Sequence, residues 1–285
     1  MSRPAPYPVV VCTLPGEREE ALAGILGQWP VLGCQVEPGE AGRIRVTVYL
    51  PPGEDEAVPA LVAALESLGG EASVPAGLEP GDWLAAYREH VRPFSVGRTW
   101  WIDPHPDDPS PAPPGRVRLL LQPRSAFGSG SHETTRLMLL ALEDRDLAGL
   151  DVLDVGTGSG VLAIAALRRG ARSVVAFDVD PEAVGVARQT FAVQEPPVSC
   201  GLFAGTIRCV AQERFGLVLA NIVSGILLPL LPAIRDVLVP GGEAVLSGFL
   251  AAERATAVGE VLAAGLGVAR ERTLDEWLAL EVRRV

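Results

Sequence analysis

The run Asp-Val-Gly-Thr-Gly-Ser-Gly at residues 154–160 restricts the possible folds of this chain more than any other stretch. It follows an apolar, strand-like segment at 150–153 and precedes a helix-like segment at 161–168. Alternating glycines permit a sharp turn and let a ligand sit against bare peptide groups, and the helix N-terminus beyond them offers free N–H donors. A strand, a glycine turn and a helix in this order predict a nucleoside pocket in an α/β sheet.

The residues around this turn indicate which nucleoside-containing ligand the pocket binds. The next strand-like segment ends in Asp178, and an acid about 20 residues beyond a glycine turn can accept hydrogen bonds from ribose hydroxyls. Gly158, Gly160 and Ala163 fit the dinucleotide pattern G-x-G-x-x-G/A. The register that begins at Gly156, with an acid two residues before it, favours S-adenosylmethionine, whose ammonium needs a carboxylate or carbonyls nearby. A dinucleotide remains the alternative.

The composition indicates a globular chain of one large or two modest domains, because 48% of its 285 residues are hydrophobic. It contains neither an apolar run of about 18 residues nor a secretory signal pattern, so we expect a cytoplasmic protein without a membrane partner. Its four cysteines lack metal-ligand spacing, which predicts buried free thiols and no metal. The net charge of −11 disfavours direct, sequence-specific nucleic-acid binding and fits a basic partner. We expect a monomer.

The first 80 residues predict a small α/β unit. Its elements follow the order β-α-β-β-α-β, which is the ferredoxin-like arrangement. The strand at 43–50 alternates strictly, with Ile44, Val46 and Val48 facing one side. The expected strands are 7–14, 31–36, 43–50 and 71–74, and the expected helices are 17–28 and 55–68.

A proline-rich stretch separates this unit from the remainder of the chain. It begins with an expected helix at 82–90 and contains an expected exposed loop at 103–115. Segments 100–102 and 117–121 are candidates for additional strands. The predicted division of the chain is a ferredoxin-like domain over 1–80, a connector helix and Pro-rich linker over 81–115, and a larger α/β domain over 116–285.

The catalytic half predicts a Rossmann-like sheet. From residue 125 onward, strand-like and helix-like segments alternate, which indicates a parallel sheet covered on both faces. The last two strand-like segments, 268–272 and 277–282, are too close together for a parallel crossover, so an antiparallel hairpin is expected. The predicted fold is therefore α/β, a Rossmann-like class I methyltransferase with an antiparallel C-terminal hairpin, plus a small N-terminal ferredoxin-like α+β domain. Such a hairpin is unusual in dehydrogenases.

Asn221 is the strongest catalytic candidate. It is the only asparagine in a chain that has no lysine, and a G+C-rich genome would explain the scarcity of both residues. It follows the apolar segment 215–220, at the carboxyl end of a predicted strand, where ligands bind in open α/β sheets. Its side-chain and backbone carbonyls can accept bonds from a substrate amine and aim the nitrogen lone pair at a methyl group. Alternatively, Asn221 caps the following helix.

A second loop of small residues, 125–135, precedes a helix expected at 134–143. Its hydroxyl and N–H groups suit the amino-acid end of a methyl donor. Thr135 fits that function and a helix-start function equally well, and both interpretations stay open. His132 is a weak candidate for acid–base chemistry, because the chain has three histidines and no hydrolase triad pattern.

The chain resembles the PrmA family, the methyltransferases of large-subunit ribosomal protein L-eleven. Residues 126–136, A-F-G-S-G-S-H-E-T-T-R, are similar to that family's signature A-F-G-T-G-x-H-x-T-T-x. Residues 154–160 and 177–181 are similar to its donor loop and ribose acid. Residues 220–222 are similar to its A-N-I/L motif, and 246–250 to its L-S-G-I-L strand.

The resemblance covers residues 116–277 and implies both an activity and a site. It implies methyl transfer from S-adenosylmethionine, without a metal, to lysine ε-amines and the N-terminal α-amine of a large-subunit ribosomal protein. The resemblance also implies that the domain over 1–80 recognises the substrate and that the domain over 116–285 carries out catalysis, with Asn221 as the catalytic residue. The positions expected to bind the cofactor are Thr135, Gly156, Gly158, Asp178 and Asn221.

Other functions remain open at this point. One alternative is a methyltransferase for another protein or a small amine. A second is a non-catalytic binding module that uses the N-terminal domain for docking, and a third is a dinucleotide oxidoreductase. The methylated positions, the number of methyl groups and the state of the ribosomal substrate do not follow from the sequence.

Overall fold

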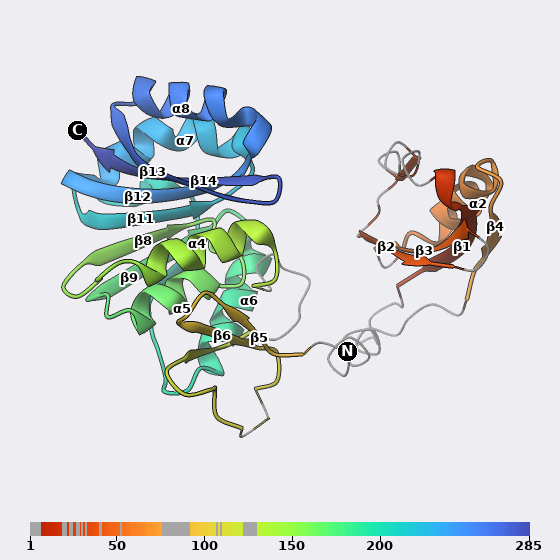
Figure 1. The fold of residues 1–285 in the computed structure, drawn as a ribbon, viewed down its shortest axis with the longest axis horizontal. Coiled ribbons are helices and arrows are strands. Elements are labelled where there is room, and N and C mark those ends of the chain that lie inside the picture. The colour runs from red at the N-terminus through yellow and green to blue at the C-terminus, as the bar shows by residue number, and fades with distance from the viewer. Residues whose placement is uncertain are drawn as a thin grey trace. The chain divides into compact units, whose positions relative to one another are not determined.

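The structure is a computed structural model, and its chain divides into two compact units, Met1–His90 and Val91–Val285 (Figure 1). The connector helix expected at 82–90 and the loop residues 125–129 lie outside the described residues. The described residues are 7–18, 22, 25–26, 29, 31, 33–39, 42–51, 53–75, 92–106, 108, 110–121 and 130–285.

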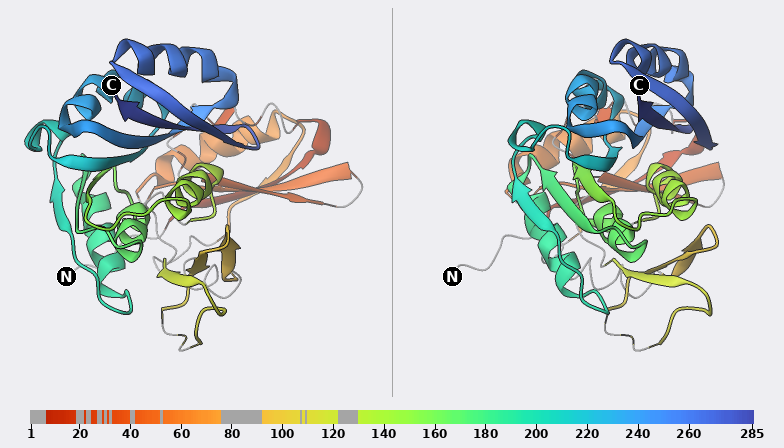
Figure 2. Two further views of the ribbon diagram at one scale, coloured as in Figure 1. Left: turned by 60° about the vertical axis from the view of Figure 1, so that its left-hand side comes forward. Right: turned by 90° about the vertical axis from the view of Figure 1, so that its left-hand side faces the viewer.

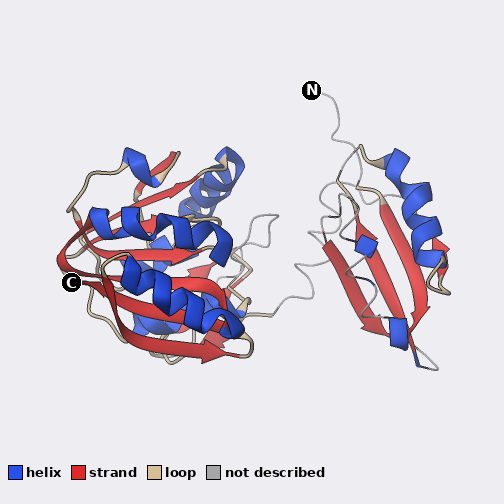
Figure 3. Ribbon diagram, turned by 90° about the horizontal axis from the view of Figure 1, so that it is seen from above, coloured by secondary structure: helices blue, strands red, loops and turns tan. Residues whose placement is uncertain are grey.

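The first unit contains a four-stranded antiparallel sheet in the order β2-β3-β1-β4. Figure 3 shows helix α2 lying along this sheet, and Leu61 and Leu65 of α2 are fully buried in its core. The order agrees with the ferredoxin-like prediction. Leu22 and Leu26 of the expected first helix are helical and buried, but most of that helix lies outside the described residues. The bounds are β1 (Val9–Pro15), β2 (Gly33–Pro38), β3 (Arg43–Tyr49), α2 (Val58–Glu66) and β4 (Glu71–Ser73).

The second unit is built on a seven-stranded sheet in the order β10-β9-β8-β11-β12-β14-β13. The first five strands in this order run parallel, and β14 is antiparallel to both of its neighbours. The predicted terminal hairpin is thereby confirmed, and only Asp275 and Glu276 link its strands. The bounds are β8 (Asp151–Val155), β9 (Ser173–Asp178), β10 (Gly201–Ala204), β11 (Phe215–Asn221), β12 (Leu238–Leu250), β13 (Leu266–Leu274) and β14 (Trp277–Arg284).

Helices cover both faces of this sheet (Figure 2). Because side chains alternate along a strand, Val152 of β8 joins the core shared with α4, α5 and α6, and Leu153 joins the core shared with α7 and α8. This confirms the covered parallel sheet that the alternating segments predict. The helices are α4 (Glu133–Glu143), α5 (Val161–Arg168), α6 (Pro181–Ala192), α7 (Ser224–Val237) and α8 (Arg254–Ala263).

A three-stranded sheet, β5 (Phe94–Val96), β6 (Trp100–Asp103) and β7 (Val117–Leu120), packs within the second unit. Trp100 of β6 is fully buried, and its Nε1 donates to the backbone oxygen of Leu139 in α4 at 2.8 Å. Part of the stretch predicted as a connector therefore belongs to the core of the second unit. The three-residue strand β5 had escaped prediction because prolines dominate the pattern around it.

The four cysteines are free, but their burial differs from the prediction. Cys12 is buried and Cys200 is half-buried, whereas Cys34 and Cys209 are exposed. Cys34 lies on β2, at the edge of its sheet, and the sequence does not show which strand lies at an edge. In the described part of the chain, no helix is long and apolar enough to cross a membrane, and no three metal-ligating side chains gather.

An ion-pair network attaches α4 to the terminal hairpin. Glu281 of β14 accepts a hydrogen bond from Arg145 Nη2 at 2.8 Å and also pairs with Arg272 Nε. Arg272 reaches on to Asp144 at 2.7 Å, just beyond the end of α4. The side chains of Arg145, Arg272 and Glu281 are 13%, 14% and 9% exposed, so these charges depend on one another for compensation.

Glu281→Gln should destabilise the protein by about 2–3 kcal/mol, because it leaves two mostly buried guanidinium groups short of a negative partner. The matched control is Glu271→Gln in the same hairpin. Glu271 pairs with Arg254 at 2.6 Å, but the side chain of Arg254 is 58% exposed, so the expected loss is about 0.5 kcal/mol. Urea unfolding of the full chain measures both values, and equal losses would contradict the assigned importance of burial.

Candidate active site at the carboxyl edge of the central sheet

The predicted site residues come from three strands that are neighbours in the sheet. The order β9-β8-β11 places Asp178, the glycine turn after β8 and Asn221 at adjacent carboxyl ends. The strand order reverses here, because the chain proceeds from β8 to β9 and β10 on one side and from β11 to β12 on the other. Ligands of open α/β sheets bind at such a switch point.

The glycine turn is anchored to the end of β9. Gly156 N and Thr157 N donate to the backbone oxygen of Phe177 at 3.0 and 2.9 Å, and Gly158 N donates to Asp178 Oδ2 at 3.0 Å. Gly156 and Gly158 have φ values of 69° and 52°, which side chains rarely adopt. Their N–H groups are therefore used within the protein, and these glycines offer a ligand space rather than donors.

Asp178 is fixed by two backbone bonds. Its Oδ2 accepts from Gly158 N, and its Oδ1 accepts from Asp180 N at 3.1 Å. Asp180 itself caps α6 by accepting from Glu182 N at 2.8 Å. Each carboxylate oxygen of Asp178 keeps a lone pair, so a ribose diol can still donate to it.

Asp154 is a buried carboxylate beneath the turn. Its Oδ2 accepts from Thr157 Oγ1 at 2.7 Å, while its Oδ1 has no hydrogen-bond partner within the described chain. Burial raises the pKa of this carboxyl from 3.8 to about 6 and the negative charge of Asp178 raises it further, whereas the Thr157 bond and a backbone interaction with Ala163 oppose the rise. A buried, incompletely bonded acceptor favours a cationic or donating ligand at this place.

Asn221 and Thr135 meet across 86 positions of sequence. Asn221 Nδ2 donates to Thr135 Oγ1 at 3.4 Å, and Thr135, in the first turn of α4, is 1% exposed. Among the described residues, no other hydrogen bond holds the Asn221 side chain. The helix-cap alternative for Asn221 is wrong, because the N-cap of α7 is Val223 and no side chain bonds there.

The backbone just after Asn221 is seated against strand β12. Ile222 N donates to the backbone oxygen of Ser247 at 3.1 Å. Gly248 has a φ of 99°, and a Cβ placed on it would lie 2.1 Å from the backbone oxygen of Ile222. A Cβ on Gly156 would likewise meet the Ile222 side chain at 3.0 Å. Gly248 and Ile222 thus set the position of Asn221, although neither residue was predicted to have a function.

His132 serves as the N-cap of α4. Its Nδ1 accepts from Thr134 N at 3.3 Å, and its ring meets Trp277 edge-on at a centroid distance of 5.0 Å. These contacts account for the residue structurally and add nothing to the weak acid–base hypothesis. His132, and not Thr135, is therefore the residue that caps the start of α4.

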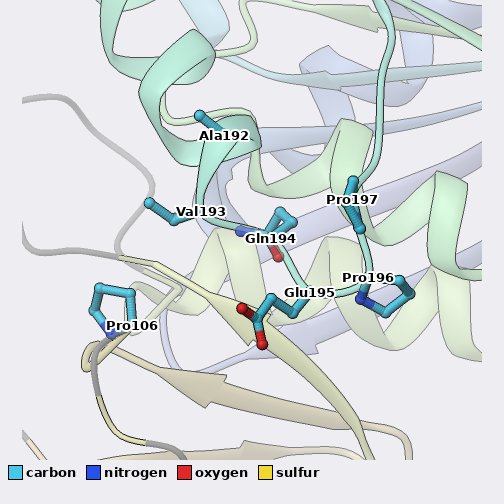
Figure 4. A pocket seen from close by; sticks show the side chains of 7 residues that line it. All are labelled: Pro106, Ala192, Val193, Gln194, Glu195, Pro196 and Pro197. Atoms are coloured by element: carbon cyan, nitrogen blue, oxygen red, sulfur yellow. The ribbon is translucent and has the colours of Figure 1, made fainter.

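A separate cavity of about 600 Å³ lies at the far end of α6 (Figure 4). Three prolines, Pro106, Pro196 and Pro197, contribute to its wall together with Glu195. Helix α6 starts beside Asp178 and is 12 residues long, or about 18 Å, so this cavity is remote from the glycine turn.

The fold and the site define a Rossmann-like class I methyltransferase. A model of the ribosomal protein L11 methyltransferase family (PrmA) matches residues 25–285. The protein of that name from Geobacter metallireducens is 39% identical over 203 residues, which are 71% of this chain and 66% of the relative. The one from Pelobacter propionicus is 33% identical over 96% of both chains.

A solved structure supports the same grouping. The crystal structure of a ribosomal protein L11 methylase from Lactobacillus delbrueckii subsp. bulgaricus superposes with a TM-score of 0.63 at 29% identity. The match covers 68% of this chain and 99% of that one. The chain belongs to the ribosomal protein L11 methyltransferase family.

Gly248→Ala should displace the Asn221 segment, because the added methyl group would overlap the Ile222 carbonyl. We expect a loss of about 3 kcal/mol in stability and a lower turnover in methyl transfer. Gly241→Ala in the same strand is the control: its φ is 72°, nothing lies within 4 Å, and only about 1 kcal/mol of backbone strain is expected. Urea unfolding measures the stability of both variants, and a methyl-transfer assay measures their turnover. If the Gly248 variant equals the Gly241 variant in both quantities, Gly248 does not position Asn221.

Asp154→Asn should change how stability depends on pH. The folded pKa of about 6 exceeds the unfolded value of 3.8, so the neutral carboxyl stabilises the fold fully below pH 4, and this contribution is lost as the pH rises through 6. The ligand-free variant should therefore gain up to about 3 kcal/mol on the wild type between pH 4 and pH 7. Urea unfolding at several pH values measures this difference, and a constant difference would contradict the raised pKa.

Proposed function

We propose that this chain transfers methyl groups from S-adenosylmethionine to amines of ribosomal protein L11, the substrate in its family's name. The observation that carries the proposal is the placement of Asn221, held by Thr135, two strands from the ribose acid Asp178 across the switch point. Lysine ε-amines and the N-terminal α-amine are the acceptors that the family resemblance implies.

The residues present fit the donor. The ribose hydroxyls would donate to Asp178, whose orientation is fixed by two backbone N–H groups. The glycine turn at Gly156 and Gly158 leaves room for S-adenosylmethionine. The segment that includes Thr135 would lie near the amino-acid end of this donor. Asp154 adds a buried negative charge beneath the turn, which suits a positively charged ligand. The bound donor supplies an electrophilic methyl group on a sulfonium centre.

Asn221 would orient the acceptor. Its Nδ2 is engaged by Thr135, so its Oδ1 is left to accept a bond from the substrate amine. The backbone carbonyl beside it offers a second acceptor. Two bonds to the amine hydrogens would aim the nitrogen lone pair at the methyl carbon, and this alignment supplies a large part of the rate in displacement reactions.

The amine must lose its proton before transfer. At pH 7 a free lysine lies about 3.4 units below its pKa of 10.4, which corresponds to about 4.6 kcal/mol. A desolvated position beside a positive charge lowers the pKa of an ammonium group, so the site itself favours the neutral amine. We therefore assign no dedicated base. His132 serves as a helix cap and receives no catalytic function.

The N-terminal unit would recognise the ribosomal substrate. Residues 1–90 carry five arginines against thirteen acidic residues, an excess of negative charge that suits a basic ribosomal protein. We retain the domain assignment of 1–80 for recognition, 81–115 as connector and 116–285 for catalysis. The proposal includes a cytoplasmic monomer that acts without a metal and without direct, sequence-specific contacts to nucleic acid.

The test is the intact mass of ribosomal protein L11 after incubation with the enzyme and donor. Wild type should add methyl groups, and Asn221→Ala should lower turnover about 100-fold with little loss of stability, because the half-buried side chain has one long hydrogen bond. Thr135→Ser, which keeps the hydroxyl, is the matched control and should stay within a few-fold of wild type. Near-normal turnover of the Asn221 variant would refute its function, and unmodified L11 with wild type would refute the substrate.

A further inference from the structure

Exposed apolar side chains border the acceptor side of the active site. Val223 and Ile226, two and five residues after Asn221, are 59% and 57% exposed, and Leu250 at the end of β12 is 39% exposed. We call these three residues the acceptor rim. Single exposed apolar residues are common on proteins, but three contributed by two neighbouring strand ends at one site are not scattered.

The acceptor rim is held together by one carboxylate. Glu253, in the short helix η5 (Ala251–Glu253), accepts from Ser224 Oγ at 2.7 Å and from Leu250 N at 2.8 Å. Ile226 N donates to the backbone oxygen of Val223 at 2.9 Å, so these two side chains lie one turn apart on the same side of α7. The rim is therefore a fixed surface and not a set of independent side chains.

The order of the strands places the rim beyond the acceptor. Along the carboxyl edge, the order β9-β8-β11-β12 leads from Asp178 through the glycine turn to Asn221 and then to Leu250. The ribose acid and the acceptor rim thus lie on opposite sides of Asn221. The rim therefore lies next to Asn221 on the side away from the donor pocket, where residues that flank a target amine come within its reach.

We propose that the acceptor rim binds apolar side chains of the protein substrate next to the target amine. This inference rests on the proposed function and adds a preference for aliphatic residues beside the modified position. A small free amine has no neighbouring side chains to place there. Three aliphatic residues offer far less than the roughly 800 Å² per partner of a stable interface, which suits one transiently bound peptide segment and not a second copy of this chain.

The experiment uses the double variant Val223→Ser/Ile226→Gln in the full chain. Serine is a preferred N-cap residue and Val223 is the N-cap of α7, so the fold should be retained. The KM for ribosomal protein L11 should rise about tenfold with kcat within twofold of wild type, since apolar contact is lost outside the reacting groups. The control is Leu262→Gln on α8, which is 57% exposed and should leave KM unchanged.

Calorimetry with S-adenosylhomocysteine and sedimentation complete the test. Unchanged binding of this product by the double variant shows that the donor side is intact, so that a raised KM supports the proposal. Equal KM values in the variant, its control and wild type overturn the rim but not the proposed function. If the wild type sediments as a dimer and the double variant as a monomer, the three residues form a self-association surface, and this result also overturns the proposal. A wild-type chain that methylates no protein overturns both proposals.

Discussion

The close approach of two backbones decides how this site is built. Gly248 lies so near the carbonyl of Ile222 that no side chain fits, and its φ of 99° is one that other residues rarely adopt. The bond from Ile222 N to Ser247 extends the β11–β12 pairing by one residue beyond the register of the strands. Asn221 is therefore carried on backbone that is held on one side by β12 and touched on the other by the glycine turn, and its position follows from the sheet itself.

The electrostatics of the donor side complement this rigid frame. Asp154 has one carboxylate oxygen without a partner in the described residues, and burial raises its pKa to about 6. Asp178 stands one strand away with both oxygens oriented by backbone N–H groups. A buried acid with incomplete hydrogen bonding lowers the stability of the folded protein. At a ligand site the same group favours binding of a cationic ligand, so stability is lower there and binding is stronger.

The sequence predicted the periodic parts of the molecule well. The helix at 161–168, the terminal hairpin and the covered parallel sheet follow from apolar spacing and short links. Asn221 was placed correctly at a strand end, because it directly follows the apolar segment 215–220. Its contact with Thr135 was beyond prediction, since 86 residues separate them and only the packing of α4 brings them together. The steric constraint at Gly248 and the incomplete bonding of Asp154 were likewise beyond prediction, because both depend on neighbours in space that residue order does not reveal.

The Asn221–Thr135 bond has a consequence for assembly. Loop closure over 86 residues must precede it, and it exists only once α4 has packed against the sheet. By contrast, the bond from Gly158 to Asp178 on the nucleoside side joins residues only 20 positions apart. Orientation of the acceptor therefore depends on longer-range packing than the shape of the nucleoside pocket does.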